Sequence, residues 1–198
     1  CPPQRSFVVP FTHFFHAACA SPMPDMLPDW YPAKRHPAPP DAPLFDWLCH
    51  EGSLTLRLTE AGDQDFRVEL LKQAPEPAHD DEAAALGLSP GTLVWTREVL
   101  LHTAGAPRVY ARSVAPTSAL GNAAVELDSL GTTSLGHLLF RNPQIRRGPI
   151  EISRYPADRL PASWRSEGLW ARRSHFSDGK LQLLVCEVFL QGWPLAGT

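Results

Sequence analysis

The stretch "LVWTREVLLH", residues 93–102, alternates in the manner of a β-strand and decides the fold class. Because alternate side chains of an extended chain share a face, one face carries Trp95, Val99 and Leu101 with Arg97 among them. A guanidinium stays charged at neutral pH and is costly to bury without a partner. Arg97 therefore indicates either a buried structural ion pair or a pocket for a small ligand.

Other alternating stretches surround this strand along the chain. The turn residues of "HTAGAPR" join it to a second strand, and "SDGK" joins two more, because Asp-Gly supplies the positive backbone angles of a tight hairpin. Between the first two expected strands, residues 74–91 are expected to be a polar loop. Strands are expected at residues 65–73, 93–102, 108–115 and 149–155 and in the two halves of 169–190.

Two short helical pairs interrupt the strands. In "PLFDWLCHEG", residues 43–52, the apolar side chains share one helical face up to Gly52, and Ser53 can cap a second helix. The stretch "LDSLGTTSLGHLLF", residues 127–140, has the same outline, with Thr132, Thr133 or Ser134 as the cap. Strands joined by hairpins and accompanied by a few helices predict an α+β fold with an antiparallel sheet.

The composition excludes several classes of protein. Eighteen basic and 21 acidic residues give a net charge of -3, and no basic stretch is interleaved with aromatic residues, so no nucleic-acid partner is expected. No apolar run is long enough for a membrane span. The four cysteines lack metal-ligand spacing and are expected to be reduced thiols. His13 and His16 would share a helix face, but no third ligand is recognisable nearby, so no metal is expected.

The first 43 residues contain 11 of the 21 prolines, a density that prevents regular helix or central strand over most of this segment. We therefore expect a Pro-rich N-terminal extension over residues 1–43 and one domain over residues 44–198.

A second charge interrupts an apolar row in the last expected strand. In "KLQLLVCEVFL", residues 180–190, Glu187 shares a face with Leu183, Val185 and Phe189. Arg97 and Glu187 are then either partners in a buried ion pair, or polar groups that orient a small ligand in an apolar pocket. The alternation of residues leaves both interpretations open.

Seven stretches together resemble the chorismate lyase family, over about residues 44–190. The resemblance implies a six-stranded antiparallel sheet with helix-turn-helix lids over a buried site. It also implies a cofactor-free conversion of chorismate to 4-hydroxybenzoate and pyruvate, the first step of ubiquinone synthesis, in the cytoplasm. The stretches are "LFDWLCHEGSLTLRL", "LVWTREVLL", "ARSVAPTSAL", "LGTTSLGHLLF", "IEISR", "GLWARRSHF" and "LLVCEVFL".

The resemblance also implies site residues. The product-binding arginine of the family corresponds to Arg97 and its buried glutamate to Glu187, and two lid positions that touch the ligand correspond to Leu54 and Leu135. Leu54 departs from the methionine that is more common there.

The substrate carries a second carboxylate, on its enolpyruvyl group, which needs a further cation. Arg112 is the first candidate and Arg173 the second. A second departure from the family is "YPADRLPASWRSE", residues 155–167, which is longer than the family's connection.

Two other classes of protein are compatible with this fold. The same fold serves as the effector-binding domain of some transcription regulators, but those carry a DNA-binding helix-turn-helix before it, and a Pro-rich segment cannot form one. A ligand-binding protein without catalytic activity is the second alternative, because binding and catalytic residues coincide in this site.

Overall fold

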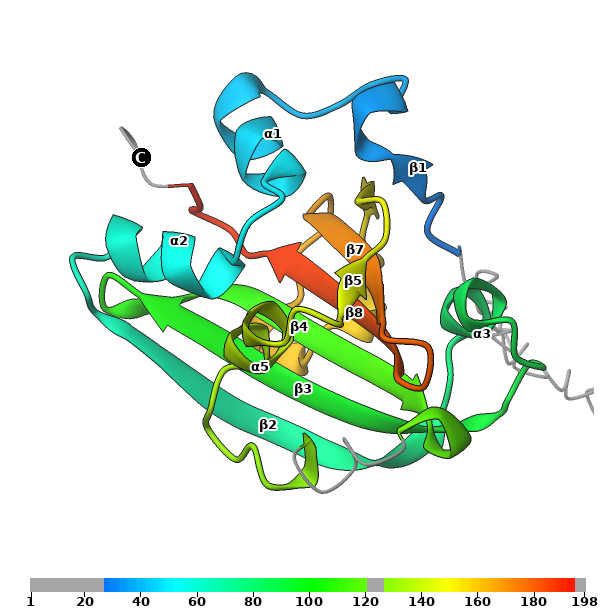
Figure 1. Ribbon diagram of the computed structural model, residues 1–198. Coiled ribbons are helices and arrows are strands. Elements are labelled where there is room, and N and C mark those ends of the chain that lie inside the picture. The colour runs from blue at the N-terminus through cyan, green and yellow to red at the C-terminus, as the bar shows by residue number, and fades with distance from the viewer. Residues whose placement is uncertain (1–26, 121–126, 195–198) are drawn as a thin grey trace, which may run out of the picture.

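The computed structural model describes residues 27–120 and 127–194. Its strands form one antiparallel sheet in the order β1-β6-β7-β8-β4-β3-β2, with β5 pairing with β7 beside this path (Figure 1). Six strands correspond to the expected sheet, and the two-residue strands β1 and β5 enlarge it to eight among the described residues. The strands are β1 Tyr31–Pro32, β2 Phe66–Pro77, β3 Leu93–Thr103, β4 Ala106–Pro116, β5 Arg146–Arg147, β6 Glu151–Arg154, β7 Trp170–Ser177 and β8 Gln182–Phe189.

Both predicted hairpins are present, and the turn residues account for them. Ala104 and Gly105 adopt φ values of 50° and 71°, the left-handed conformation that the tight turn between β3 and β4 requires. Between β7 and β8, Gly179 has φ 89°. The Asp178 side chain accepts hydrogen bonds from the backbone N–H groups of Lys180 and Leu181 at 2.9 and 2.7 Å.

The two faces of the sheet have different covers. The pocket face, which carries Trp95, Arg97, Val99 and Leu101, lies beneath three helices, α1 Ala42–Cys49, α2 Leu54–Ala61 and α5 Leu135–Arg141 (Figure 1). Below, α1 and α2 are called the first lid, and residues 130–141, which include α5, the second lid. Both lids were expected as helical pairs.

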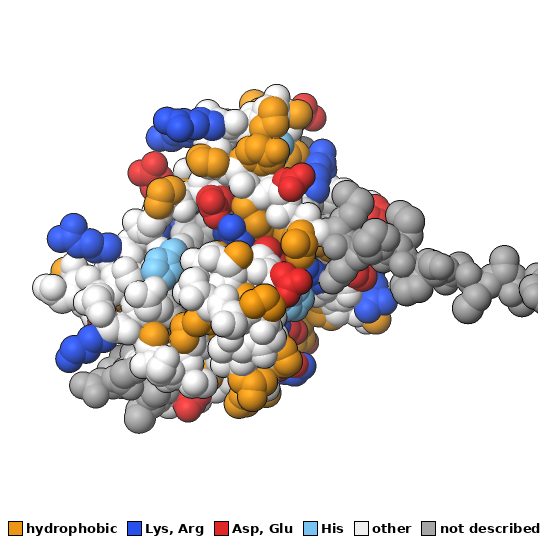
Figure 2. Space-filling model, turned by 90° about the vertical axis from the view of Figure 1, so that its right-hand side faces the viewer, with side chains coloured by type: hydrophobic (Ala, Val, Ile, Leu, Met, Phe, Trp, Pro, Cys, Tyr) orange, Lys and Arg blue, Asp and Glu red, His pale blue; other side chains and the backbone are white. Residues whose placement is uncertain are grey.

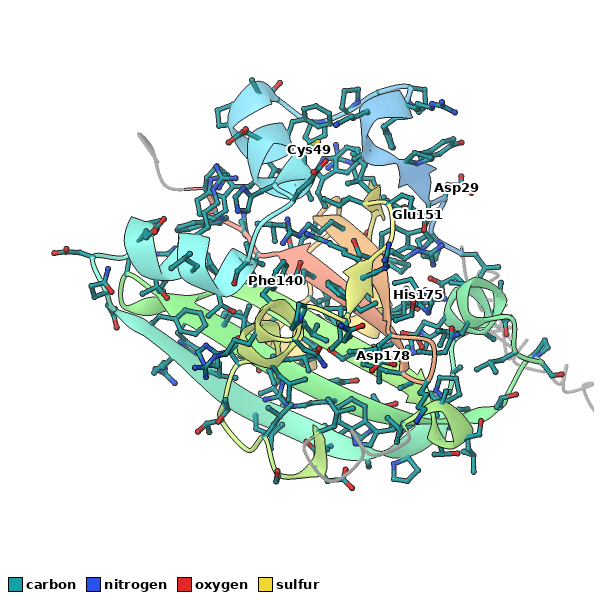
Figure 3. The ribbon with its side chains drawn as sticks, in the orientation of Figure 1. Asp29, Cys49, Phe140, Glu151, His175 and Asp178 are labelled. Carbon is teal, nitrogen blue, oxygen red and sulfur yellow. The ribbon has the colours of Figure 1, made fainter. Side chains whose placement is uncertain are left out.

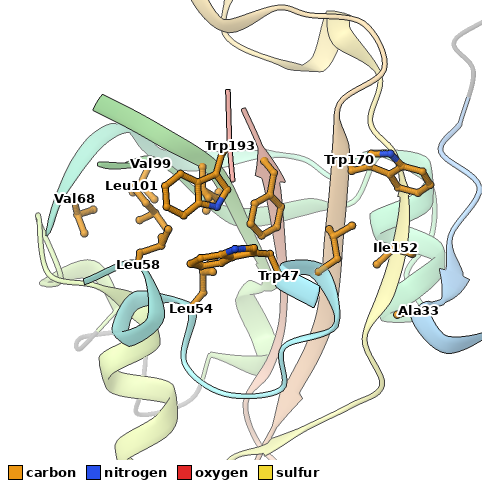
Figure 4. Packing of buried hydrophobic residues seen from close by; sticks show 14 residues of the cluster. Ala33, Trp47, Leu54, Leu58, Val68, Val99, Leu101, Ile152, Trp170 and Trp193 are labelled. Carbon is orange, nitrogen blue, oxygen red and sulfur yellow. The ribbon is translucent and has the colours of Figure 1, made fainter. Parts of the chain in front are cut away.

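The first lid is tied to the sheet by aromatic packing. Trp47, at 2% exposure, meets Trp193 edge-to-face with ring centroids 4.9 Å apart, between α1 and the strands (Figure 4). Ser53 caps α2 as expected, because its side chain accepts from the Leu56 N–H at 3.3 Å. Leu54 and Leu58 then point from α2 into the same core cluster.

The opposite or back face has a cover that the sequence analysis did not predict. Residues 74–91 were expected to be a polar loop, but β2 continues to Pro77 and α3 follows at Asp80–Leu86. The loop prediction was wrong because Ala83 packs against the sheet and Glu82 closes a capping box with His79. The longer connection, residues 155–167, covers the rest of this face with the 3₁₀ turns η3 Ala157–Arg159 and η4 Ala162–Trp164.

Part of the expected N-terminal extension packs with the domain. β1 pairs with β6, and Ala33, in the 3₁₀ turn η1 Ala33–Arg35, lies at 5% exposure in the main core. The described residues from 27 to 43 therefore lie on the sheet and at the start of α1, whereas residues 1–26 are outside the described part of the chain.

Figure 2 shows how charged side chains are distributed on one face of the molecule. On the face that Figure 2 shows, Lys and Arg side chains are separated from one another and have acidic side chains among them. This face has no continuous basic surface of the kind that nucleic-acid binding requires. Among the described residues, no helix has the length and apolar character needed to cross a membrane.

Candidate functional site

A pocket lies between the pocket face of the sheet and the two lids. Its walls are apolar apart from three arginines, one glutamate and a few hydroxyl groups. Phe140 of α5 lies over the centre of the sheet at the pocket edge (Figure 3) and is 45% exposed. The apolar lining consists of Leu54, Val68, Val99, Leu101, Ala111, Leu135, Leu139, Phe140, Phe176 and Val185.

The register of the strands fixes the floor of the pocket. One row across the sheet runs from Arg97 on β3 through Ser113 and Val185 to Ser174 on β7. The small side chains of Ser113 and of Ala111 in the adjacent row leave space above β4. Strands are about 4.8 Å apart and rise about 3.4 Å per residue, so the Cα atoms of Arg97 and Glu187 are about 12 Å apart.

Arg97 is the buried cation at the β3 side of the pocket. Its residue exposure is 2%, and its Nη2 donates to the carbonyl oxygens of Gly131 and Thr133 in the second lid at 2.9 and 3.0 Å. Its Nε is buried without a hydrogen-bond partner among the described residues. Burial lowers the pKa of Arg97, because the charged guanidinium has lost water and gained only neutral acceptors.

Glu187 lies opposite Arg97 but pairs with a different arginine. Its Oε2 accepts from Nε of Arg172, its neighbour on β7, at 2.6 Å. Arg172 is 1% exposed and also donates to the carbonyl oxygens of Trp47 and His50 in the first lid at 3.2 and 2.8 Å. Arg97 and Glu187 therefore do not form the buried ion pair that was one of the two interpretations, and both line the pocket instead.

A third arginine, Arg147 on β5, lines the pocket on the same side as Arg172. Its Nε donates to Ser174 Oγ at 2.9 Å, and its Nη1 donates to the carbonyl oxygen of Glu51 at 3.0 Å. Burial, and next the charge of Arg172, lower the pKa of Arg147 to about 10.

Arg112 does not lie in the pocket, which corrects the expectation that it meets the enolpyruvyl carboxylate. It is on the back face, 3% exposed, where it contacts Glu82 and Glu98 at 2.7 Å each and Glu76 at 3.5 Å. Burial alone would lower the pKa of Arg112, but hydrogen bonds and the charge of Glu82 raise it above its usual range. The physical reason is that successive side chains of a strand point to opposite faces of the sheet. Ala111 faces the pocket, so the next residue, Arg112, faces away from it.

Arg173, the second candidate, is also on the back face. It donates to Glu151 Oε2 at 2.8 Å and approaches Asp81 Oδ2 at 3.4 Å. Asp81 in turn accepts from Trp30 Nε1 at 2.8 Å and from Arg159 at 2.6 Å. Arg173 therefore helps to hold α3 and the N-terminal described residues on the sheet.

Leu54 and Leu135 occupy equivalent positions in the two lids. Each is the first residue of its helix and lines the pocket, with exposures of 3% and 6%. Next to them, the hydroxyl groups of Thr55 and Ser134 also line the pocket and bond to each other across the lids.

Among the residues that the structure describes, no group of three or more His, Cys, Asp or Glu side chains is placed to hold a metal ion. His13 and His16, the pair considered in the sequence, lie outside those residues. Of the cysteines, Cys49 and Cys186 are free thiols, and Cys1 and Cys19 are likewise outside the described chain.

Comparison with known proteins gives the family. The model of the chorismate lyase family matches residues 29–195. The chain belongs to this family. A probable chorismate pyruvate-lyase of Pseudomonas aeruginosa (strain UCBPP-PA14) is 53% identical over 155 residues, which cover 78% of this chain and 87% of that protein. A probable chorismate pyruvate-lyase 2 of Pseudomonas entomophila (strain L48) is 48% identical over 168 residues, covering 84% and 91%.

Among solved structures, the C-terminal domain of PhnF is similar, with a TM-score of 0.50 and 20% sequence identity. The alignment covers 63% of this chain and 82% of that domain. At this level of identity the likeness shows the fold alone. The α+β fold with an antiparallel sheet is thus confirmed for this member of the chorismate lyase family.

Arg147 and Arg172 line the pocket but were not predicted from the sequence. For Arg172 a signal was present, since it shares a strand face with Trp170 and Phe176, as Arg97 does with Trp95 and Val99. For Arg147 there was none, because a two-residue strand has no alternation to interpret.

Proposed function

We propose that the chain is a chorismate pyruvate-lyase that converts chorismate to 4-hydroxybenzoate and pyruvate without a cofactor, the first step of ubiquinone synthesis. Membership of the chorismate lyase family and the similarity to the two Pseudomonas lyases support the activity. The placement of Arg97 and Glu187 at two sides of one apolar pocket carries the assignment of this pocket as the active site.

The proposed reaction is an elimination. The ring C–O bond to the enolpyruvyl group breaks, the neighbouring ring carbon loses its proton, and the new double bond completes the aromatic ring. The proton that the methylene carbon of the enolpyruvyl group gains turns it into the methyl group of pyruvate. Aromatisation drives the reaction, so the protein has to hold the substrate in a reactive conformation and favour charge on the departing oxygen.

In this proposal Arg97 binds the ring carboxylate and Glu187 accepts a hydrogen bond from the ring hydroxyl. The buried Nε of Arg97 has no partner among the described residues, so a carboxylate that reaches it would satisfy a donor already removed from water. Leu54 and Leu135 would close over the two faces of the ring, which suits their apolar side chains at the pocket ends of the lids. Val99, Ala111 and Val185 give the ring an apolar floor.

The proposal also places the protein in the cytoplasm, as the resemblance implies. The free thiols of Cys49 and Cys186 agree with a reducing compartment.

A chorismate assay with chelator present tests this function. We expect consumption of chorismate with release of equimolar 4-hydroxybenzoate and pyruvate, each measured by liquid chromatography. Loss of activity on chelation, restored by a divalent ion, would contradict the cofactor-free reaction. Binding of 4-hydroxybenzoate without any turnover of chorismate would instead favour the alternative of a non-catalytic, effector-binding domain of the same fold.

A further inference from the structure

The charges that line the pocket are not balanced. Three guanidinium groups, those of Arg97, Arg147 and Arg172, face one carboxylate, that of Glu187. At neutral pH the lining therefore carries two positive charges in excess, in a cavity whose other walls are mainly apolar. Because unpaired buried charges are costly, this arrangement suits a ligand that brings two negative charges.

Each of these arginines has a different set of partners. Arg172 is already neutralised by Glu187 at 2.6 Å. Among the described residues, Arg97 bonds only to carbonyl oxygens of the second lid, and in the proposed function it receives the ring carboxylate. Arg147 is left as the cation without an assigned anion.

The partners of Arg147 are all neutral. Its Nε donates to Ser174 Oγ, and its Nη1 donates to the carbonyl oxygens of Glu51 and His50 at 3.0 and 3.4 Å. Within the described part of the chain it has no ion pair, and no hydrogen bond uses its Nη2. On the back face, by contrast, Arg112 and Arg173 each contact carboxylates.

The position of Arg147 matches a second anionic group on the ligand. It lies beside Ser174, which ends the same cross-sheet row that begins with Arg97. Three strand spacings of about 4.8 Å separate the two ends of this row by about 14 Å. Two arginine side chains that reach inward from these ends leave room for one small molecule with a carboxylate at each end.

We propose that Arg147 binds the second carboxylate of the substrate, the one on the enolpyruvyl group, while Arg97 binds the ring carboxylate. This inference rests on the proposed function, because it places the same substrate in the same pocket. Arg147 would bind the substrate and the departing three-carbon acid, but not the aromatic product. The aromatic product keeps only the ring carboxylate, and the departing three-carbon acid takes the other carboxylate with it.

The contacts of Arg147 also link this subsite to the first lid. His50 and Glu51 lie between α1 and α2, and their carbonyl oxygens hold the guanidinium from the lid side. Ser174 holds it from the sheet side. The connection between α1 and α2 and strand β7 thus hold the Arg147 guanidinium from two sides at the wall of the pocket.

A pair of unreactive ligands tests the subsite without turnover. The ligand 3-(carboxymethoxy)-4-hydroxybenzoate carries the second carboxylate, and 3-methoxy-4-hydroxybenzoate lacks it. Calorimetry gives the ratio of the two dissociation constants for wild type and for Arg147→Gln. We expect Arg147→Gln to weaken binding of the ligand with two carboxylates, relative to binding of the ligand with one, by about 10- to 150-fold, the range for one hydrogen bond to a charged group.

Arg146→Gln is the matched control, since Arg146 is the exposed neighbour on β5 and does not line the pocket. Its ratio should equal that of wild type. Circular dichroism checks that each variant folds. If Arg147→Gln does not fold, Arg147→Lys, which keeps the charge, replaces it. Arg147→Lys should change the ratio of dissociation constants less than tenfold, but by more than Arg146→Gln does.

An equal ratio in wild type and the Arg147 variant would overturn the inference. The chorismate assay separates this failure from a failure of the proposed function. A wild-type protein that turns over chorismate, with a ratio that does not depend on Arg147, keeps the function and loses the subsite. A ratio that depends on Arg147 in a protein without turnover keeps the subsite and loses the lyase activity.

Discussion

The hydroxyl oxygens of Thr55 and Ser134 lie 2.5 Å apart and join the two lids over the pocket. Thr55 is in the first turn of α2, and Ser134 is the residue that precedes α5. Gly136 permits this approach, because a Cβ atom there would lie 3.0 Å from Thr55 Oγ1. We therefore expect this contact to slow the release of a ligand from beneath the lids.

Thr55→Val keeps the shape of the side chain and removes the hydroxyl that bonds to Ser134. We expect faster dissociation of 4-hydroxybenzoate, by about 2- to 12-fold, the range for one neutral hydrogen bond. Stopped-flow displacement of the bound product measures this rate.

Ser134→Ala and the double variant complete a cycle that isolates the contact between the lids. Because both hydroxyl groups belong to one bond, the double variant should dissociate product no faster than the quicker of the single variants. If the change in the logarithm of the rate for the double variant equalled the sum of the changes for the single variants, the two hydroxyl groups would act separately.

Arg97→Ala should weaken 4-hydroxybenzoate binding by about 2–5 kcal/mol, the scale for truncating one partner of a buried charged pair. Benzoate, which lacks the hydroxyl, reports on Glu187. Wild type should bind benzoate less tightly than 4-hydroxybenzoate, and Glu187→Gln should narrow this difference. If Arg97→Ala lost stability but bound 4-hydroxybenzoate like wild type, Arg97 would be structural and our site assignment wrong.

Arg112→Met should lower the stability of the protein and leave the pocket unchanged. The variant leaves Glu76, Glu82 and Glu98 without their shared cation on the back face, which should reduce the free energy of unfolding by about 3–5 kcal/mol. Urea unfolding measures this loss, with the exposed Arg35→Met as the control. The dissociation constant for 4-hydroxybenzoate, measured on the folded variant, should equal that of wild type. A large increase would indicate that Arg112 takes part in ligand binding.

The pH dependence of substrate capture should report on Arg147. Its pKa is lowered to about 10 by burial and Arg172, against the opposing charges of Glu187 and Glu51. The free protein therefore loses this charge as the pH rises through about 10, and kcat/KM for chorismate should fall with it. The charged form of Arg147 destabilises the folded state below that pH, and this cost is lost above it, so the titration of Arg147 does not itself unfold the protein.

The control for this profile is Arg147→Gln, whose lower kcat/KM should lack the decrease near the pH at which Arg147 loses its proton. Circular dichroism at each pH confirms that both proteins stay folded. A decrease of the same size and midpoint in both proteins would assign the titration to another group.

The sequence by itself determined both lids and the six strands other than β1 and β5, because these elements depend on local signals. Alternation placed Arg97 and Glu187 in apolar rows, Asp-Gly set the last hairpin, and Ser53 set the start of α2. The strand faces were thus predictable from sequence, and with them the placement of each of these two charges on an apolar face of its strand. The long connection at residues 74–91 was not predictable, because α3 depends on packing against the back face.

Only the tertiary structure decided which charges meet. Arg97 and Glu187 stand on strands two positions apart in the sheet, so the order of strands, which no local pattern encodes, keeps them from pairing. The same order brings Arg172 directly beside Glu187 and lets β5 add Arg147 to the pocket. Arg112 lies one residue from Ala111 in sequence but on the opposite face, where the charge of Glu82 on α3 holds it. Alternation gives each side chain a face, whereas a partner across the sheet requires the whole fold.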